Sequence, residues 1–409
     1  MTASERTRTT FRLDCGRMYC SGVLESAATT FLLLIAVKHL ELGAIAKGWV
    51  ACGSSVGLLL SPLAVSWAAR RQVSTSRLAS QILFAGAVCC GLMASIDSVW
   101  VYIPAAVLGM AANWSIVPLM THVYQDNYPA DRRGRLYAMS IMFRITGAMS
   151  CGWVAGRLLD WDIKAYPVVL AGFGLAFAVA GFLVRRIPSN PLPDAAGAHP
   201  LHALHFIRHD RVFRQTLIVW MLMGFANLMM IPMRVEYLGN PRYGLARSAV
   251  QIALYTTVIP NLARLVMNPV WGFLFDRVNF FILRMALNFG FAIGIFAFFT
   301  SDSQLGLVLG AVTFGISSAG GDVAWGLWVT KFAPPGRVAD YMSVHTFLTG
   351  IRGVLAPMTA FQMVQRYPPP TLGWFSAILI IAATLLLVPE ISRYKAGKDE
   401  TVATEEVVD

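Results

Sequence analysis

The sequence has 409 residues, of which 56% are hydrophobic and 13% are charged, and its mean hydropathy is +0.59. Charged residues make up about 25% of an ordinary soluble domain. This composition excludes soluble globular, disordered and fibrous proteins and predicts a polytopic membrane protein. The net charge of +11 is divided among short basic clusters between apolar runs, so we expect no nucleic-acid partner.

Twelve apolar runs are each long enough for a membrane-spanning helix, which needs about 20 residues. The predicted fold is therefore all-α, with twelve transmembrane helices. In chain order the predicted spans cover residues 17–38, 45–69, 77–96, 99–124, 137–158, 164–185, 214–237, 246–275, 279–299, 304–331, 341–364 and 372–391.

Basic residues lie mainly on one side of these spans. If the N-terminus is placed in the cytoplasm, 22 of the 33 Lys and Arg residues fall in cytoplasmic segments, 7 in the opposite loops and 4 inside spans. Lys and Arg accumulate on the cytoplasmic side of membrane proteins. We therefore expect both termini to be cytoplasmic, in a bacterial inner (plasma) membrane.

The longest connection divides the spans six and six. The expected domains are a six-helix bundle (1–186), a proline-containing cytoplasmic linker with a short amphipathic helix (187–213), and a second bundle with a cytoplasmic tail (214–409). Residues 139–147 and 342–350 share Met-Ser and Thr-Gly pairs at a constant offset of 203. This repeat predicts two pseudo-symmetric halves.

Two loops connect the sequence with a known family. The segment from Asp126 to Arg135 (DNYPADRRGR), with Pro118 before it, resembles the loop between helices 4 and 5 of the major facilitator superfamily of secondary transporters. Residues 272–277 (GFLFDR) resemble the loop between helices 8 and 9 of that family. The resemblance implies transport by alternating access, with a cytoplasmic gate that we assign to Arg70, Asp126, Arg135, Asp276 and Arg277.

Some positions depart from the drug exporters of that family. The first-half duplicate of Asp276 is Ala69, so one loop carboxylate is missing. Ala106 stands near the position of the helix-4 arginine of drug/proton antiporters, and residues 151–152 read Cys-Gly where antiporters have Gly-Pro. These departures count against a standard drug exporter.

Ionisable residues inside the predicted spans are the strongest functional signal, because a charge at a helix centre costs at least about 2.5 kcal/mol. The resemblance implies that spans 1, 4, 7 and 10 line a central cavity, that spans 2, 5, 8 and 11 stand beside it, and that spans 3, 6, 9 and 12 are outer supports. We expect all the buried charges on the cavity-lining spans and the spans beside them, and none on the outer supports. By position they are Glu25, Arg144, Arg234, Glu236, Arg264, Asp322, His345 and Arg352.

Glu25 and Asp322 come from different halves, and a carboxyl group in a low-dielectric site can exchange a proton near neutral pH. Arg144 and Arg264 lie at comparable depths and are expected to pair with these carboxylates, which would couple a proton to transport. A permanent structural ion pair is the alternative.

Arg352 lies mid-span among small residues, where a guanidinium can hold a carboxylate or phosphate group of a substrate. A bond to Asp322 or to helix carbonyls accounts for it equally well. Arg234 and Glu236 are expected at an outer gate or as an interface anchor. His345 fits a packing residue better than a proton relay.

Amide and indole side chains near mid-span suit a polar organic solute such as a sugar or nucleoside, and helix packing explains them equally well. They are Asn113, Trp114, Asn227 and Trp325. Histidines at 199, 202, 205 and 209 form one helical stripe, for which interfacial cations are a better account than a metal site. Because catalytic and nucleotide-binding motifs are absent, we expect no enzyme activity and no cofactor.

The sequence thus predicts a monomeric secondary transporter that moves a small organic solute by alternating access, coupled to protons. Sodium coupling, facilitated diffusion and export of an amphiphile are open alternatives. An alternative from another class of protein is also open: a facilitator-like receptor or assembly factor that does not transport. Neither the substrate nor the direction of transport is specified by a motif.

Overall fold

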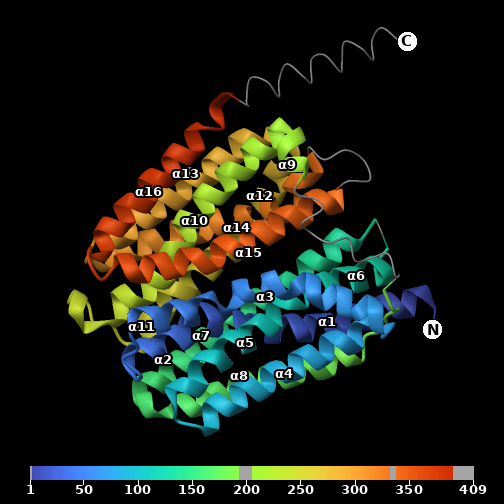
Figure 1. The fold of residues 1–409 in the computed structure, drawn as a ribbon, viewed down its shortest axis with the longest axis horizontal. Coiled ribbons are helices and arrows are strands. Elements are labelled where there is room, and N and C mark those ends of the chain that lie inside the picture. Colours follow the sequence, from blue (N-terminus) through green and yellow to red (C-terminus); the bar gives the residue numbers. More distant parts are fainter. Residues whose placement is uncertain (1, 130, 193–204, 332–337, 390–409) are drawn as a thin grey trace.

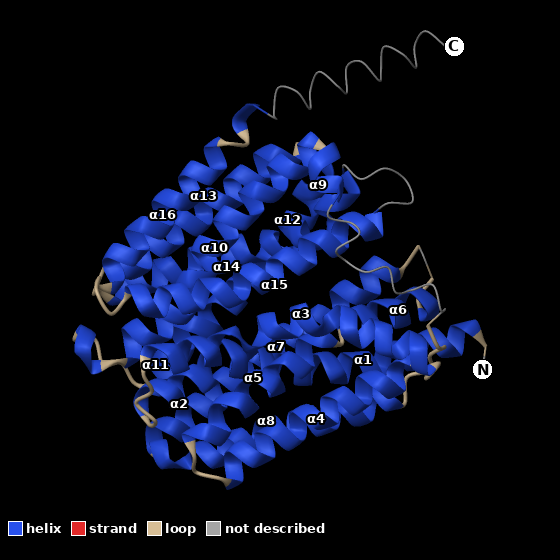
Figure 2. Cartoon of the chain, in the orientation of Figure 1, coloured by secondary structure: helices blue, strands red, loops and turns tan. Residues whose placement is uncertain are grey.

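The computed structural model describes residues 2–129, 131–192, 205–331 and 338–389. In this part of the chain the regular structure is helical, apart from an isolated β-bridge between Ser74 and Pro191 (Figure 2). The first half contains α1 (Ala3–Ser26), the π-helix η1 (Ala27–Phe31), α2 (Leu32–Lys38), α3 (Ala44–Arg71), α4 (Thr75–Ser95), α5 (Val99–Ser115), α6 (Val117–Asn127), α7 (Arg133–Trp161), η2 (Ile163–Ala165) and α8 (Tyr166–Arg185). The second half contains α9 (His205–His209), α10 (Arg211–Gly239), η4 (Pro241–Tyr243), α11 (Ala249–Ala253), the π-helix η5 (Leu254–Val258), α12 (Ile259–Arg277), α13 (Phe280–Phe299), α14 (Gln304–Leu327), η6 (Trp328–Lys331), α15 (Val338–Met363) and α16 (Pro369–Leu385).

Each predicted span coincides with one helix or with consecutive helices. Among the described residues, nine helical segments are long and apolar enough to cross a membrane, and α16 is apolar but shorter. The other two predicted spans, α7 and α15, are long but contain Arg144 and Arg352 together with many small and polar residues. Because α7 packs on α1 and α11, and α15 on α3 and α10, their polar residues can lie against protein.

The helices form two bundles, α1 to α8 and α10 to α16 (Figure 1). In the first bundle α1 packs on α7, α3 on α5, and α4 on α8; the second repeats these contacts as α10 on α15, α12 on α14, and α13 on α16. The predicted all-α fold with two pseudo-symmetric bundles is confirmed. The domain boundaries at 186 and 214 stay a prediction, because residues 193–204 lie outside the described parts.

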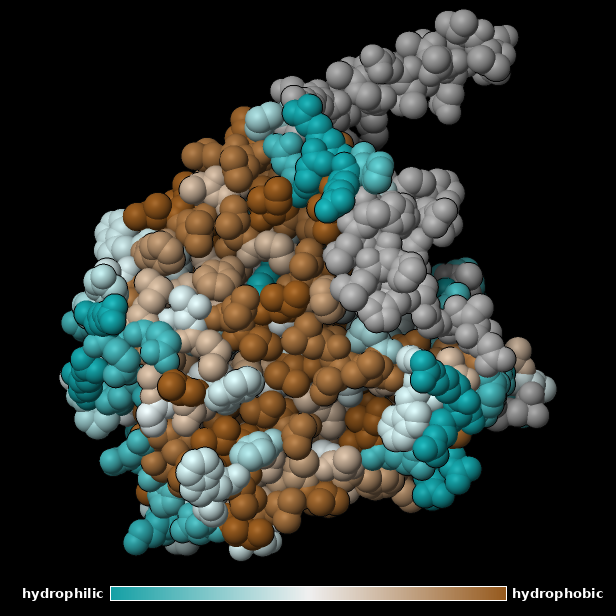
Figure 3. Space-filling model, in the orientation of Figure 1, coloured by the Kyte–Doolittle hydropathy of each residue, from teal (hydrophilic) through white to brown (hydrophobic). Residues whose placement is uncertain are grey.

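Large apolar side chains are exposed on the outer helices of both bundles. Val88, Leu175, Ile293 and Ile378, on α4, α8, α13 and α16, are each more than half exposed. In Figure 3, hydrophobic residues cover the middle of the visible face, and hydrophilic residues gather toward its two ends. Apolar surface of this extent is suited to lipid rather than water.

The bundles are joined most firmly near one end of the molecule, which we call the α2/α11 end, opposite the α6/α9 end (Figure 1). There, the Lys47 ammonium lies 2.7 Å from both Glu236 carboxylate oxygens, and the pair is buried. Asp160, at the end of α7, accepts hydrogen bonds from the first two backbone N–H groups of α11. The Lys38 ammonium donates to the Arg247 carbonyl. These contacts hold the two bundles together at this end.

Three basic residues lie in surroundings other than those predicted. Arg17, Lys47 and Arg284 stand near the ends of predicted spans and are counted above among the charges outside the membrane, Arg17 and Arg284 on the cytoplasmic side and Lys47 on the opposite side. Arg17 and Lys47 are instead buried, paired with Asp14 and Glu236. Arg284 lies in α13 and is 1% exposed. The expectation that the outer supports hold no buried charge is therefore wrong for α13. The apolar run begins before Arg284, and the Trp220 ring covers its guanidinium.

Candidate functional site

Four of the predicted charges form one connected network between the bundles, the inter-bundle network of Glu25, Arg144, Arg264 and Asp322. Arg264 Nη1 donates to Glu25 Oε1 at 2.8 Å. Arg264 Nη2 and Nε donate to Asp322 Oδ2 at 2.6 and 3.0 Å. Arg144 Nε lies 3.3 Å from Glu25 Oε2. The network thus links α1 and α7 of the first bundle with α12 and α14 of the second.

Local breaks in helix geometry lie next to this network. The π-helix η1 begins two residues after Glu25, and the π-helix η5 ends six residues before Arg264. The two π-helices contact each other across the bundles, where the Thr30 hydroxyl forms hydrogen bonds with Thr256 and Thr257 at 2.9 and 2.8 Å. Single π turns inside α-helices are frequent at functional sites. They place the two charged helix segments face to face.

A chain of polar atoms also holds the Arg264 guanidinium from its own helix. Asn261 Oδ1 accepts from Arg264 Nη1 at 3.0 Å, and Asn261 Nδ2 donates to the Thr257 carbonyl at 2.9 Å.

In the inter-bundle network two guanidinium groups face two carboxylates, so the charges balance when all four groups are ionised. The Asp322 side chain is 37% exposed and the Glu25 side chain 19%, whereas that of Arg264 is 11% exposed. Water can therefore reach the carboxylates more readily than the cation between them.

A small cavity lies beside Glu25 and Arg144 in the first bundle. Its lining includes Ser21, Asn113 and Trp114, two of which were predicted to contact solute. Ser21 Oγ donates a long hydrogen bond of 3.5 Å to Asn113 Oδ1. The helix is interrupted just beyond these residues, between α5 and α6 at Ile116, where Pro118 follows. The amide and the indole line this cavity together with Glu25 and Arg144.

Arg352 and His345 do not join this network. They lie inside the second bundle with Trp220 and Arg284, and we call these four residues the Trp220 cluster. The Arg284 guanidinium stacks on the Trp220 ring at 3.6 Å from its centroid, and Arg352 Nη1 donates to the Trp220 carbonyl. The His345 ring centroid is 5.1 Å from that of Trp220 and 5.8 Å from that of Trp325. Of the two bonds expected for Arg352, the one to a helix carbonyl is present.

The two predicted outer-gate residues have separate surroundings. Glu236 forms the buried ion pair with Lys47 that joins the bundles, and it also accepts from Asn240 at 2.8 Å. Arg234 instead lies within the second bundle, 3.4 Å above the centroid of the Phe314 ring. Lys47, the partner of Glu236, was missed because it lies one turn from a loop and was counted as a surface charge.

The predicted cytoplasmic-gate residues lie at the α6/α9 end. Arg70, Arg135 and Arg277 are exposed, and among the described residues no hydrogen bond or ion pair joins them to the opposite bundle. Asp126 accepts from Asn190 at 3.3 Å within its own bundle. The side chain of Asp276 lies outside the described parts. The gate role of these residues stays a prediction.

The last predicted residues are Asn227 and the histidine stripe. Asn227 is half-buried in α10, and its amide oxygen has no hydrogen-bond partner in the described structure. Histidines 199 and 202 lie outside the described residues. Among those that are described, no group of three or more His, Cys, Asp or Glu side chains is arranged to hold a metal ion.

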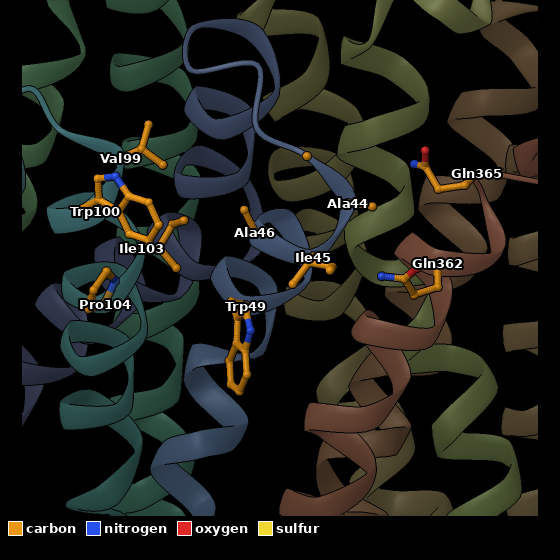
Figure 4. A pocket seen from close by; sticks show the side chains of 11 residues that line it. Ala44, Ile45, Ala46, Trp49, Val99, Trp100, Ile103, Pro104, Gln362 and Gln365 are labelled. Carbon is orange, nitrogen blue, oxygen red and sulfur yellow. The ribbon is translucent and has the colours of Figure 1, made fainter.

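A larger cavity, of about 700 Å³, lies at the α2/α11 end, away from the charged network (Figure 4). It is lined from α3 by Trp49, from α5 by Trp100 and Ile103, and from α15 and the turn after it by Gln362 and Gln365. Its walls are largely apolar, and Trp100 is 88% exposed. Tryptophan is typical of the membrane–water interface. This cavity is therefore a surface recess and does not belong to the charged site.

Comparison with known proteins agrees with this architecture. Among solved structures, the chain is similar to the nucleoside transporter NupG (TM-score 0.72, 13% identity, covering 94% of this chain and 99% of that one). It is also similar to a D-xylose–proton symporter (TM-score 0.66, 16% identity, 94% and 96%) and to the inward-open xylose transporter XylE from E. coli (TM-score 0.69, 14% identity, 94% and 96%). Curated protein sequences give no match. The family model of the Major Facilitator Superfamily matches residues 18–357. The chain therefore belongs to the Major Facilitator Superfamily, and it is an integral membrane protein and a transporter rather than an enzyme.

Proposed function

We propose that the chain moves a small polar organic solute across the bacterial inner membrane by alternating access, coupled to protons. The observation that carries this proposal is the inter-bundle network. Arg264 of the second bundle bonds at once to Glu25 of the first bundle and to Asp322 of its own. One cation shared by two carboxylates on different bundles responds both to bundle movement and to protonation.

Protonation of Glu25 would change the balance of this network. A neutral carboxyl group attracts a guanidinium less than a carboxylate does, so Arg264 would remain with Asp322 alone. The ion pair that joins α1 to α12 would then be lost, which lowers the energy needed to separate the bundles there. Loss of the proton would restore the bond across the bundles. The state of Glu25 thus decides whether the two halves are electrostatically joined at mid-molecule.

The distribution of basic residues supports the orientation of the chain. The α6/α9 end carries the clusters around Arg70, Arg135 and Arg211, and basic residues favour the cytoplasm. The α2/α11 end, which the Lys47–Glu236 pair and Asp160 close, would then face outward. In this assignment the structure is closed to the outside.

The solute class is proposed from the cavity beside Glu25. An amide from Asn113, a hydroxyl from Ser21 and the indole of Trp114 provide hydrogen bonds and a stacking surface. These groups suit a neutral polyhydroxylated solute, a sugar or a nucleoside. The cavity volume of about 60 Å³ is below the ~300 Å³ of typical ligand sites. Solute would therefore bind as the space between the bundles widens.

The test uses purified full-length protein in liposomes. Sugars and nucleosides are first screened by their effect on the melting temperature, because a ligand of the folded state raises it. Uptake of the stabilising solute is then measured with and without an imposed pH gradient. We expect the gradient to drive accumulation in the wild type. Glu25→Gln and Asp322→Asn should lose accumulation and keep exchange of labelled for unlabelled solute.

Asp162→Asn is the matched control, because this carboxylate is exposed in the loop before η2 and should leave accumulation unchanged. Accumulation that follows a sodium gradient, or equilibration that ignores both gradients, would contradict proton coupling. Exchange of no solute at all would contradict transport and would favour a receptor or assembly factor.

A further inference from the structure

The Trp220 cluster buries positive charge without a negative partner. Arg284 is 1% exposed, His345 is fully buried and Arg352 is 9% exposed. Within the described residues neither guanidinium forms an ion pair with a carboxylate. Arginine keeps its proton in proteins. Two positive charges therefore lie beside Trp220 in the interior of the second bundle, Arg284 over its ring and Arg352 at its backbone carbonyl.

Many hydrogen-bond donors of this region have no partner. They belong to the two arginines, the histidine, the tryptophan and two threonines one turn away on the same helix faces. In the described structure the partnerless atoms are Arg284 Nε and Nη1, Arg352 Nε, His345 Nδ1 and Nε2, Trp220 Nε1, Thr216 Oγ1 and Thr349 Oγ1. A buried polar group without a partner costs about 1–3 kcal/mol, and a charged one costs more. So many buried donors without an acceptor suit the binding of a negatively charged group.

The helix spacing aligns these groups in two facing stripes. Thr216, Trp220 and Gly224 recur every four residues on α10, and His345, Thr349 and Arg352 recur at four and three on α15. Gly224 allows the close approach, because a Cβ there would overlap the Arg352 guanidinium. The stripes converge at the Trp220 carbonyl, which Arg352 contacts. The arrangement brings hydrogen-bond donors from α10, α13 and α15 together, and the guanidinium groups of Arg284 and Arg352 are the cations among them.

We propose that the Trp220 cluster binds a small inorganic anion, of the size of chloride or phosphate, between Arg284 and Arg352. The anion neutralises the like charges and accepts the unpartnered hydrogen bonds. The site is separate from the inter-bundle network, whose cations already have carboxylate partners, and it goes beyond the proposed transport function.

Arg234 provides an internal comparison. It is also buried and has no carboxylate partner in the described residues, but it is a single cation over the Phe314 ring, with Phe298 nearby. A guanidinium over an aromatic face is stabilised by cation–π attraction. Arg234 Nε and Nη2 also lack a hydrogen-bond partner in the described structure, but Arg234 rests on aromatic rings and belongs to no cluster of cations. In the Trp220 cluster two guanidinium groups share one site, and only Arg284 lies over an aromatic ring. The need for a neutralising anion is therefore greater in the cluster.

The test measures the melting temperature of the purified full-length protein without solute. Gluconate, a bulky organic anion, is replaced stepwise by chloride, and separately by phosphate, at constant ionic strength. We expect a saturable rise of several degrees with at least one of the two. Arg284→Gln and Arg352→Gln should abolish the rise, and Arg234→Gln should keep it. A rise that does not saturate, or one that persists in all three variants, would overturn the proposal.

A second measurement does not depend on the variants. Crystals of the wild-type protein soaked in bromide should show an anomalous peak between the Arg284 and Arg352 guanidinium groups. No peak at saturating bromide, together with a melting temperature that is independent of the anion, would overturn the proposal. Because neither experiment involves solute or a pH gradient, failure here leaves the transport proposal intact, and the converse also holds.

Discussion

The inter-bundle network and the Trp220 cluster each bury two guanidinium groups, but they differ in what surrounds them. In the network two carboxylates balance the two cations, and the residues come from both bundles. In the cluster the described residues provide no carboxylate, and all members belong to one bundle. A buried charge in this fold is therefore not in itself a sign of transport. Only charges paired across the bundles are placed to respond to their relative motion.

The largest effect is expected from Arg264, because it holds both carboxylates of the network. Arg264→Met would leave Glu25 and Asp322 close together without their shared cation. Breaking a buried ion pair from one side costs about 3–5 kcal/mol. We expect loss of gradient-driven accumulation by at least about 100-fold, measured as solute uptake in liposomes. If this variant accumulated solute to the wild-type level, the network would not take part in coupling.

A buried pair at the α2/α11 end should behave as a structural contact instead. Lys47→Met leaves the Glu236 carboxylate buried without its cation and should lower the unfolding free energy by about 3 kcal/mol. The double variant Lys47→Met/Glu236→Gln should recover most of this loss. Thermal unfolding of the single and double variants measures the coupling. Additive losses would show that the pair does not join the bundles.

Packing inside the Trp220 cluster gives a smaller effect. Gly224→Ala places a Cβ against the Arg352 guanidinium and should lower stability by about 1–3 kcal/mol. Gly172→Ala is the matched control, because a Cβ at this α8 position meets no atom within 4 Å. Melting temperatures of both variants provide the comparison. Equal melting temperatures would contradict the close approach of α10 and α15.

The smallest effect is expected where Asp160 of α7 caps the first turn of α11. Asp160→Ala removes the acceptor of two backbone N–H groups and should lower stability by about 1 kcal/mol, as for loss of an ordinary helix cap. Amide hydrogen exchange at residues 249 and 250 would locate the change. Unchanged exchange there would show that the α7–α11 contact contributes little.

Hydropathy predicts most of the spans in this chain, because a helix in contact with lipid must be largely apolar. The twelve predicted spans all coincide with helices, including α7 and α15, which are among the most polar. Charge inside those spans identifies Glu25, Arg264 and Asp322 as candidates. Their connection into one network depends on the packing of the two bundles against each other, including the contact between η1 and η5, which no hydropathy pattern indicates.

Charges near the ends of spans are where the prediction from sequence fails. Arg17, Lys47 and Arg284 lie near the ends of predicted spans, and the same sequence pattern is compatible with a solvated side chain. Whether such a residue is buried depends on an aromatic or acidic partner from a distant helix. Asp14, Glu236 and Trp220 provide these partners, and only the three-dimensional packing brings them together.

The most direct test of the account is proton movement during solute entry, measured with a pH-sensitive dye inside weakly buffered liposomes and without an imposed gradient. The account predicts that adding solute outside acidifies the interior of liposomes with wild-type protein. It predicts no acidification with Glu25→Gln, although labelled solute still exchanges. Solute entry into wild-type liposomes without any proton movement would contradict the claim that the inter-bundle network couples the two.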